Sequence, residues 1–541
     1  MAARTLTTEA TNQNRSHGRE DLPWDNPRLL WQKYCGFLEL SPSLFMDIQS
    51  QLLLEQVQLL ANCSLGKKFL QGRIPRTVEE FRNIVPLTSY SDYLPTLEQK
   101  DEGSLAETPF CWSHTTGDRG DFKFVPYTHR AYDLLLDNVL AAFLLASAKG
   151  YGEVNLKASD RVMYNIPPRP YLSGLVTFGM QEKFGFQGVL NAQESEPLDF
   201  HERTERQVQK ALDNGVDVIV SMTSILVKLG AKFAEQSQRD HPLKLGSACR
   251  LRLAKAWLNS RIRRRPLRPS DIWPIKAVLG WGIDSAFFKE QVYRYWGKEP
   301  YEFYACTEGG VMAVQSWKHQ GMILVPYSDF YEFIPEEESI KSWRDRSYQP
   351  ATVLADQLEA GKSYEMVITN FYGMPFMRYR VGHLIKVVSL GEKDSGIKLP
   401  SISLEGRCDD LIDVAGFTRL SEKTVWSALS RADLLDTEWV LCKEANGSAP
   451  VLHLYLEADA PNGDIGRRIE ASLKEVDPFF SDLEDMLEIR PFRLTNLAPG
   501  TFKRFYDEKR KAGVAVGQLR PPRINPSPDT IRDLLRLGQS G

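Results

Sequence analysis

The segment KEPYEFYACTEGG, residues 298–310, joins an apolar, strand-like run to a polar turn that ends in two glycines. Similar short apolar runs alternate with longer helical patterns along residues 159–369: DRVMYNI (160–166), GVDVIVSM (215–222), IKAVLGWG (275–282) and YEMVITNF (364–371). Because parallel strands are joined by crossover connections that are usually helices, this alternation predicts an α/β fold with mixed, largely parallel sheets and flanking helices.

The turn after the 298–310 strand carries side chains that suit a nucleotide. In open α/β sheets, ligands bind outside the carboxyl ends of the strands. There Tyr304 could stack on a base, Thr307 could hydrogen-bond a phosphate, and Glu308 could hold Mg²⁺ through its oxygens. An ordinary strand end followed by a turn would carry the same residue types, so the segment alone leaves both interpretations open.

Length and composition favour a multi-domain protein that binds neither nucleic acid nor a membrane. A chain of 541 residues exceeds one ordinary core, and its 67 basic and 70 acidic residues leave a net charge of only -3. The apolar run at 139–148 covers about half of the ~20 residues that a membrane span needs. The basic run at 249–273 is interpreted as a solvated helix followed by a proline-marked connection.

Seven cysteines occur singly, an odd number without a CxxC pair, which indicates reduced thiols and a cytoplasmic location. Residues 1–22 are interpreted as a loose tail, 23–405 as a large N-terminal domain, and 406–541 as a smaller α+β domain joined to it by a hinge. In the large domain, residues 43–62 follow a serine and carry Leu and Ile at helical spacing. The smaller domain has three predicted strands and one predicted helix: TEWVLCK (437–443), PVLHLYLEA (450–458), LEIRPFRL (487–494) and GDIGRRIEASLKEV (463–476).

The segment SHTTGDRGDFKFVPYT, residues 113–128, is a second candidate for phosphate binding. Glycine lets backbone N–H groups turn toward an anion, threonine hydroxyls donate to phosphate oxygens, and a lysine neutralises charge. The segment is not a P-loop, because Gly117 and Gly120 are too close together and Phe124 follows Lys123. A plain β-turn is the alternative interpretation.

Four motifs occur in a characteristic order: TTG before a lysine, YACTE, YRVG, and GRCDDLIDVAG at 406–416. This series resembles that of the acyl-adenylate-forming superfamily of acyl-CoA synthetases, luciferases and adenylation domains. Four longer segments, at 81–95, 329–338, 361–387 and 498–524, resemble the plant auxin-responsive acyl-acid amido synthetases and their microbial relatives. The last of them, APGTFKRFYDEKRKAGVAVGQLRPPRI, resembles an ending that CoA ligases generally lack.

The resemblance implies ATP-dependent activation of a carboxylic acid to an acyl-adenylate, followed by transfer to an amine or amino-acid acceptor. It implies that Mg²⁺ is bound by Glu308, and that Glu308, Thr307 and Arg520 are catalytic. The residues that it assigns to ATP are Thr115, Thr116, Gly117 and Lys123 for the phosphates, Tyr304 for adenine, Thr307 for the α-phosphate, His383 at the ribose position, and Arg407 for ribose or phosphate. It assigns Asp409 to the interdomain hinge.

Three positions depart from the family pattern. His114 stands in place of a glycine, and Arg520 stands where the ending often has lysine. His383 replaces the aspartate that accepts hydrogen bonds from both ribose hydroxyls, whereas a neutral imidazole offers one acceptor. Two other functions therefore stay open: an acyl-CoA ligase that forms a thioester, which the GRCDD motif favours, or a homologue that handles acyl groups without adenylation.

Overall fold

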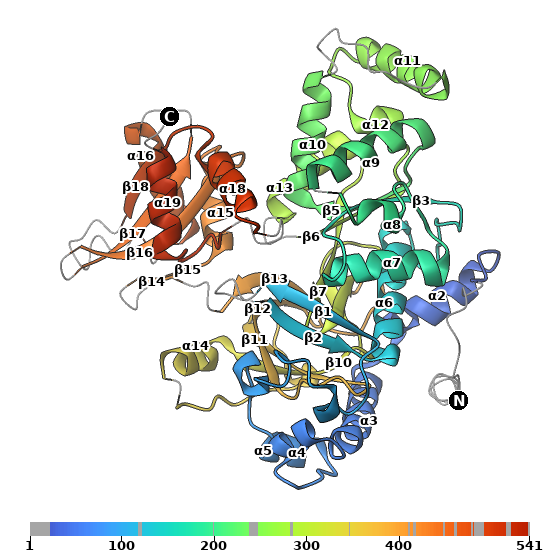
Figure 1. Ribbon diagram of the computed structural model, residues 1–541, viewed down its shortest axis with the longest axis vertical. Coiled ribbons are helices and arrows are strands. Elements are labelled where there is room, and N and C mark those ends of the chain that lie inside the picture. The colour runs from blue at the N-terminus through green and yellow to red at the C-terminus, as the bar shows by residue number, and fades with distance from the viewer. Residues whose placement is uncertain are drawn as a thin grey trace.

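The computed structural model describes residues 22–116, 122–198, 200–236, 247–281, 285–345, 347–408, 412–414, 418–446, 449–458, 462–477, 480, 492–514 and 521–538. A large body and a smaller C-terminal unit are distinct in Figure 1. No helix in the described ranges is both long enough and apolar enough to cross a bilayer. Six of the seven cysteines are free thiols: Cys35, Cys63, Cys111, Cys306, Cys408 and Cys442. The predicted tail, residues 1–22, lies outside them except for Leu22.

Eleven strands of the described chain form one sheet in the order β10-β11-β12-β13-β9-β8-β7-β6-β5-β3-β4. One half is parallel and consists of β3 (Arg161–Asn165), β4 (Gln187–Gly188), β5 (Val218–Met222), β6 (Ala277–Trp281) and β7 (Pro300–Cys306). The other half pairs antiparallel and consists of β8 (Gly310–Gln315), β9 (Met322–Leu324), β10 (Asp329–Pro335), β11 (Ser363–Asn370), β12 (Tyr379–Ser389) and β13 (Ser401–Arg407).

The predicted α/β fold with a mixed sheet is confirmed, but within the eleven-stranded sheet parallel pairing is confined to β3–β7. The predicted strand at 364–371 became β11, which pairs antiparallel on both sides. The connections explain the difference. All successive strands from β3 to β7 are separated by helices, whereas β7 to β9 follow one another through short turns that reverse the chain.

Helices flank the sheet on both faces (Figure 1). Those of the large body are α2 (Pro27–Cys35), α3 (Pro42–Leu60), α4 (Ser64–Leu70), α5 (Val78–Ile84), α6 (His129–Ser147), α7 (Leu172–Phe184), α8 (Ala192–Ser195), α9 (Phe200–Asn214), α10 (Thr223–Gln236), α11 (Ser247–Ile262), α12 (Pro269–Ile272), α13 (Ser285–Trp296) and α14 (Glu336–Arg344). The predicted helix at 43–62 is α3, and Ser41 Oγ caps it by accepting a hydrogen bond from Leu44 N at 3.2 Å.

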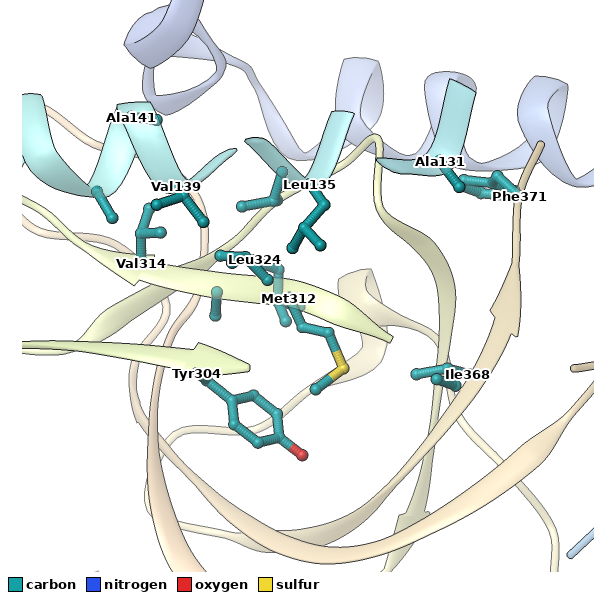
Figure 2. Close-up of a cluster of buried hydrophobic side chains, with 14 of the residues drawn as sticks. Ala131, Leu135, Val139, Ala141, Tyr304, Met312, Val314, Leu324, Ile368 and Phe371 are labelled. Carbon is teal, nitrogen blue, oxygen red and sulfur yellow. The ribbon is translucent and has the colours of Figure 1, made fainter. Parts of the chain in front are cut away.

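Helix α6 is buried along most of its length because its apolar side chains cover the sheet. Figure 2 shows Leu135 and Val139 of α6 over the β8 residues Met312 and Val314, with Tyr304 of β7 beside Met312. The α6 helix follows a separate hairpin of β1 (Cys111–Thr116) and β2 (Phe122–Tyr127). The second phosphate-binding candidate, residues 113–128, therefore includes most of β1 and all of β2.

The C-terminal unit is built on β16 (Glu438–Asn446), β17 (Ala449–Glu457) and β18 (Phe492–Leu497). Around this sheet lie α15 (Glu422–Arg431), α16 (Asn462–Val476), α18 (Thr501–Lys511) and α19 (Pro528–Gly538), with a small hairpin of β14 (Ile412–Val414) and β15 (Thr418–Leu420). The predicted strands at 437–443 and 450–458 and the predicted helix at 463–476 are present as β16, β17 and α16, whereas the predicted strand at 487–494 lies outside the described residues except for 492–494, which begin β18. The unit contacts the large body where Trp426 meets Phe288 edge-on at 5.7 Å between ring centroids. The predicted domain boundary at 405/406 stays a prediction.

Candidate functional site

The turn that follows β7 is anchored through its carbonyl groups. Tyr127 Oη donates to Thr307 O at 2.8 Å, from the end of the β1–β2 hairpin. Asn370 Nδ2, at the end of β11, donates to Glu308 O at 2.9 Å. Two segments that lie far from the turn in the sequence therefore fix the backbone of Thr307 and Glu308, the residues that the sequence assigns to phosphate and Mg²⁺.

The Glu308 side chain lies among tyrosines at the same end of the sheet. It is 9% exposed, and its Oε1 accepts a hydrogen bond from Tyr379 Oη at 3.2 Å. Burial raises the pKa of Tyr127, Tyr304 and Tyr379 well above the usual value, and the charge of Glu308 adds to each shift. These phenols stay protonated and neutral near pH 7, and those of Tyr127 and Tyr379 donate hydrogen bonds to the turn.

Tyr304 and His383 form a direct contact. Tyr304 Oη lies 2.7 Å from His383 Nδ1, and the two rings are tilted by 51° with centroids 5.6 Å apart. Arg407 of β13 is the register partner of His383 on β12. The fold thus brings together three of the residues that the sequence assigns to the nucleoside. Tyr304 itself is only 3% exposed, and its stacking on adenine stays a prediction.

The β1–β2 hairpin places Thr115 opposite Lys123 in an antiparallel ladder. Tyr90 binds the backbone of Phe124, the residue after Lys123. Its Oη accepts a hydrogen bond from Phe124 N at 2.6 Å and donates one to Phe124 O at 3.1 Å. Lys123 Nζ lies 5.7 Å from the centre of the Tyr90 ring. Burial raises the pKa of Tyr90 to about 12, and the charge of Glu308 contributes to this shift, so Tyr90 senses the Glu308 carboxylate as well as the hairpin.

His114 is part of β1 rather than of the turn between the two strands. Its backbone N donates to Pro170 O at 3.3 Å, and its ring meets Tyr171 edge-on with centroids 4.3 Å apart. Burial lowers the pKa of His114, and the charge of Lys100 lowers it further. An extended strand with an aromatic neighbour explains why an imidazole is accommodated where the family has a glycine.

Two arginines on either side of Tyr379 are structural. Arg378 donates Nε and Nη2 to Glu332, each at 2.9 Å, and Arg380 donates Nε to Glu365 at 2.8 Å and Nη2 at 2.6 Å. Glu332 and Glu365 are at most 1% exposed. These pairs therefore hold the chain on both sides of Tyr379, whose Oη donates to Glu308 Oε1.

Several of the predicted site residues cannot be located here. Thr116 is described only as part of β1. Gly117, Asp409 and Arg520 lie outside the described residues. Conversely, the sequence did not identify four residues near the site: Tyr127, Asn370, Tyr379 and Lys100. The Nζ of Lys100 lies 4.4 Å from the centre of the Phe124 ring. Tyr379 had a signal, since it stands inside the YRVG motif, but Asn370 meets Glu308 only through strand pairing.

The residues around Glu308 fit Mg²⁺ bound together with a nucleotide. Mg²⁺ in phosphate-transfer sites is held by one or two carboxylates, while substrate phosphates and water supply the remaining oxygens. Across the described residues, no group of three or more His, Cys, Asp or Glu side chains is arranged to hold a metal. Glu308 alone could supply the carboxylate, and its Oε1 is already oriented by Tyr379.

Two family models match the chain. The GH3 family N-terminal domain matches residues 37–235, and the GH3 family central domain matches residues 322–401. Together they cover more than half of the chain and include the β1–β2 hairpin, β10, β11 and β12.

Similar proteins carry related names. The chain is 25% identical to the jasmonoyl–L-amino acid synthetase GH3.5 of Oryza sativa subsp. japonica over 226 residues. The matched region covers 39% of this chain and 38% of that protein. The matched part thus spans about two fifths of that relative. The acyl acid amido synthetase AtGH3.15 in complex with 2,4-DB has the same fold, with a TM-score of 0.69, 17% identity, and 96% and 97% of the two chains covered.

A 2-hydroxyisobutyryl-CoA ligase in its postadenylation state shares the fold at lower similarity. The TM-score is 0.58 with 13% identity, over 93% of this chain and 94% of that one. The architecture is therefore common to amide-forming and thioester-forming enzymes, and the fold does not select the acceptor.

Proposed function

The chain belongs to the GH3 family, and from this premise we propose that it activates a carboxylic acid with ATP and transfers the acyl group to an amine, which forms an amide. The observation that carries the proposal is the Thr307–Glu308 turn at the carboxyl end of β7. Its two carbonyls are fixed by Tyr127 and Asn370, and the Glu308 carboxylate is oriented by Tyr379.

In the first step, a carboxylate oxygen of the acid attacks the α-phosphorus of ATP, and the bond to pyrophosphate breaks. Thr307 donates to the α-phosphate, while Thr115, Thr116 and Lys123 on the β1–β2 hairpin hold the β- and γ-phosphates. Glu308 would hold Mg²⁺, which neutralises charge on the phosphate oxygens when bound. Because the protein does no covalent chemistry in this step, its contribution is positioning and charge stabilisation.

In the second step, an amine nitrogen attacks the acyl carbon and AMP leaves. The sequence assigns Arg520 to this chemistry and Asp409 to a hinge between the two domains, and both assignments stay predictions. The names of the relatives support an amino acid as the acceptor. A thiol acceptor is the second candidate, because a CoA ligase shares the fold. The cytoplasmic location expected from the cysteines also stays a prediction.

Carboxylate-dependent exchange of radiolabelled pyrophosphate into ATP tests the first step. With Mg²⁺ and a panel of aromatic and aliphatic acids, we expect exchange that Glu308→Gln lowers by about 100-fold or more, because the carboxylate is lost while the shape is kept. Glu359→Gln is the matched control, since its side chain is 62% exposed in a surface ion pair. Absence of exchange from folded wild-type protein with every acid would refute the proposal.

The acceptor is tested with the acid that gives the strongest exchange. Mixtures containing either amino acids or coenzyme A are analysed by mass spectrometry for the amide and the thioester. We expect the amide. A thioester with coenzyme A, and no amide with any amino acid, would assign the second step to a thiol.

A further inference from the structure

The segment DFYEFIPEEE, residues 329–338, matches the family but has no role in the function proposed above. It forms β10 and begins with Asp329, which is 1% exposed. One carboxyl oxygen, Oδ1, accepts from Asn370 Nδ2 at 2.7 Å. The other, Oδ2, has no hydrogen-bond partner among the described residues. A buried carboxyl with one unpartnered oxygen is costly for the fold, so its position calls for an explanation.

Asn370 connects this carboxyl to the functional turn. The same Nδ2 that donates to Asp329 also donates to Glu308 O at 2.9 Å. The amide cannot be reversed, because Asn370 Oδ1 accepts from Phe376 N at 3.1 Å and only the NH₂ group can serve the two acceptors. Its two hydrogens are thus shared between Asp329 and the main chain of Glu308.

Asp329 is itself held rigidly. Gln49 of α3, which is 1% exposed, donates Nε2 to Asp329 O at 2.7 Å. The same side chain accepts from Tyr331 N at 3.0 Å through Oε1. A buried side chain of the neighbouring helix therefore fixes the start of β10, which gives Asn370 a fixed partner.

The unpartnered oxygen lies against the turn. A Cβ atom added to Gly309 would lie 3.1 Å from Asp329 Oδ2 and 2.8 Å from Met312 Sδ. A cavity of about 20 Å³, lined by Asp329, Asn370, Tyr127 and Gly310 among others, separates this group from α6. Burial raises the pKa of Asp329 well above its usual value, in agreement with a carboxyl that has no cationic partner.

We propose that Asp329 is a positioning residue, which acts through Asn370 to set the main chain of Glu308 in the geometry that the adenylation step needs. The inference rests on the proposed function. Asp329 occupies one hydrogen of the Asn370 amide and thereby aims the other at Glu308 O. Without this acceptor the amide keeps only its bonds to Phe376 N and Glu308 O, so the hydrogen bond that fixes the Glu308 carbonyl is aimed less strictly.

Three variants separate positioning from general stability. Asp329→Asn keeps an oxygen acceptor for Asn370 with the same shape, whereas Asp329→Ala removes it. Glu392→Ala is the matched control, because Glu392 is also buried, at 5% exposed, and has one unpartnered oxygen, but its other oxygen bonds Ser316. The measurements are amide hydrogen exchange of peptides covering residues 304–312, and kcat and KM for ATP in the pyrophosphate-exchange assay.

For Asp329→Ala we expect faster hydrogen exchange in the turn and a kcat lowered by about 10–100-fold, the usual penalty for a displaced reacting group. Asp329→Asn should restore both to within about twofold, because it keeps the bond to Asn370. Glu392→Ala should lower the thermal midpoint without affecting either measurement. If Asp329→Ala does not fold, Gly309→Ala displaces the same turn from the other side and should reproduce the loss of kcat.

Two results would overturn the inference: equal effects of Asp329→Ala and Glu392→Ala on the turn, or failure of Asp329→Asn to restore it. If no acid supports pyrophosphate exchange by the wild-type protein, the proposed function fails. Amide hydrogen exchange alone then decides whether Asp329 positions the turn. Faster exchange in Asp329→Ala but not in Asp329→Asn would then still support positioning of the turn.

Discussion

Tyr304 Oη lies 2.7 Å from His383 Nδ1, and this contact joins β7 to β12 at the end of the sheet where the candidate site lies. Burial keeps the phenol of Tyr304 protonated by raising its pKa. When the phenol donates to Nδ1, the proton of the neutral imidazole resides on Nε2. His383 then offers a donor at the position where the family has a carboxylate acceptor.

This geometry predicts the effect of restoring the carboxylate. His383→Asp should tighten ATP binding by about tenfold or more, since a hydrogen bond to a charged group contributes about 1.5–3 kcal/mol. Arg407, the register partner, can balance the added charge. Isothermal titration calorimetry with ATP measures the change, and His383→Asn is the uncharged control. Unchanged or weaker binding of His383→Asp would argue against the ribose assignment.

The lysine of the hairpin should act on ATP through its charge. Lys123→Met should raise KM for ATP by about 3–30-fold with a smaller change in kcat, because a charge-assisted hydrogen bond to phosphate is lost. Lys123→Arg keeps the charge and should recover part of the affinity. The exchange assay measures both constants, with the exposed Lys67→Met as a control. An unaltered KM in Lys123→Met would place the lysine outside the phosphate site.

The buried pair of Arg378 and Glu332 should dominate stability at the start of β12. Arg378 has a φ of 43° and also donates Nη1 to Arg82 O at 2.7 Å and Val85 O at 2.8 Å. Glu332→Ala would leave this guanidinium buried without its carboxylate, at a cost of about 3–5 kcal/mol in the free energy of unfolding. Urea denaturation followed by circular dichroism measures it. Glu359→Ala, at an exposed pair, should leave the midpoint nearly unchanged.

Tyr90 should make the protein sensitive to alkaline pH. Its pKa is about 12 in the folded chain against a reference value of 10.0. Because the folded pKa is the higher one, the stabilisation is complete below pH 10 and is lost as the pH rises from 10 toward 12.

The variant Tyr90→Phe isolates this contribution. It should lose about 1–3 kcal/mol at pH 8, where Phe124 N becomes unsatisfied, and its stability should fall less steeply between pH 10 and 12 than that of the wild type. Denaturation series at several pH values measure both effects. Tyr293→Phe, at a position 56% exposed, is the control. A slope identical to that of the wild type would contradict the assignment.

The sequence was sufficient to predict several strands and to recognise the family. The strands now numbered β3, β5, β6, β7 and β11 were predicted from apolar runs, because strand formation depends on side chains close together in the sequence. The superfamily resemblance followed from motif order and the family resemblance from four longer segments, and both family models match. The sequence did not predict that the strands from β8 to β13 pair antiparallel, since an apolar run has the same pattern in a parallel and in an antiparallel strand.

The tertiary structure alone decided how the site is held. Asn370 reaches Glu308 across 62 residues of sequence, and Tyr304 reaches His383 across 79. Such bonds depend on strand order and register, which no local pattern encodes, because a hydrogen bond needs its donor and acceptor within about 3 Å. The sequence by itself pointed to Tyr304, Glu308 and His383 but not to Tyr127, Asn370 or Tyr379, which hold the turn of Glu308 in place. Folding determined that His383 is bound by a tyrosine, and that the carbonyl of Glu308 is held by an asparagine whose other partner is a buried acid.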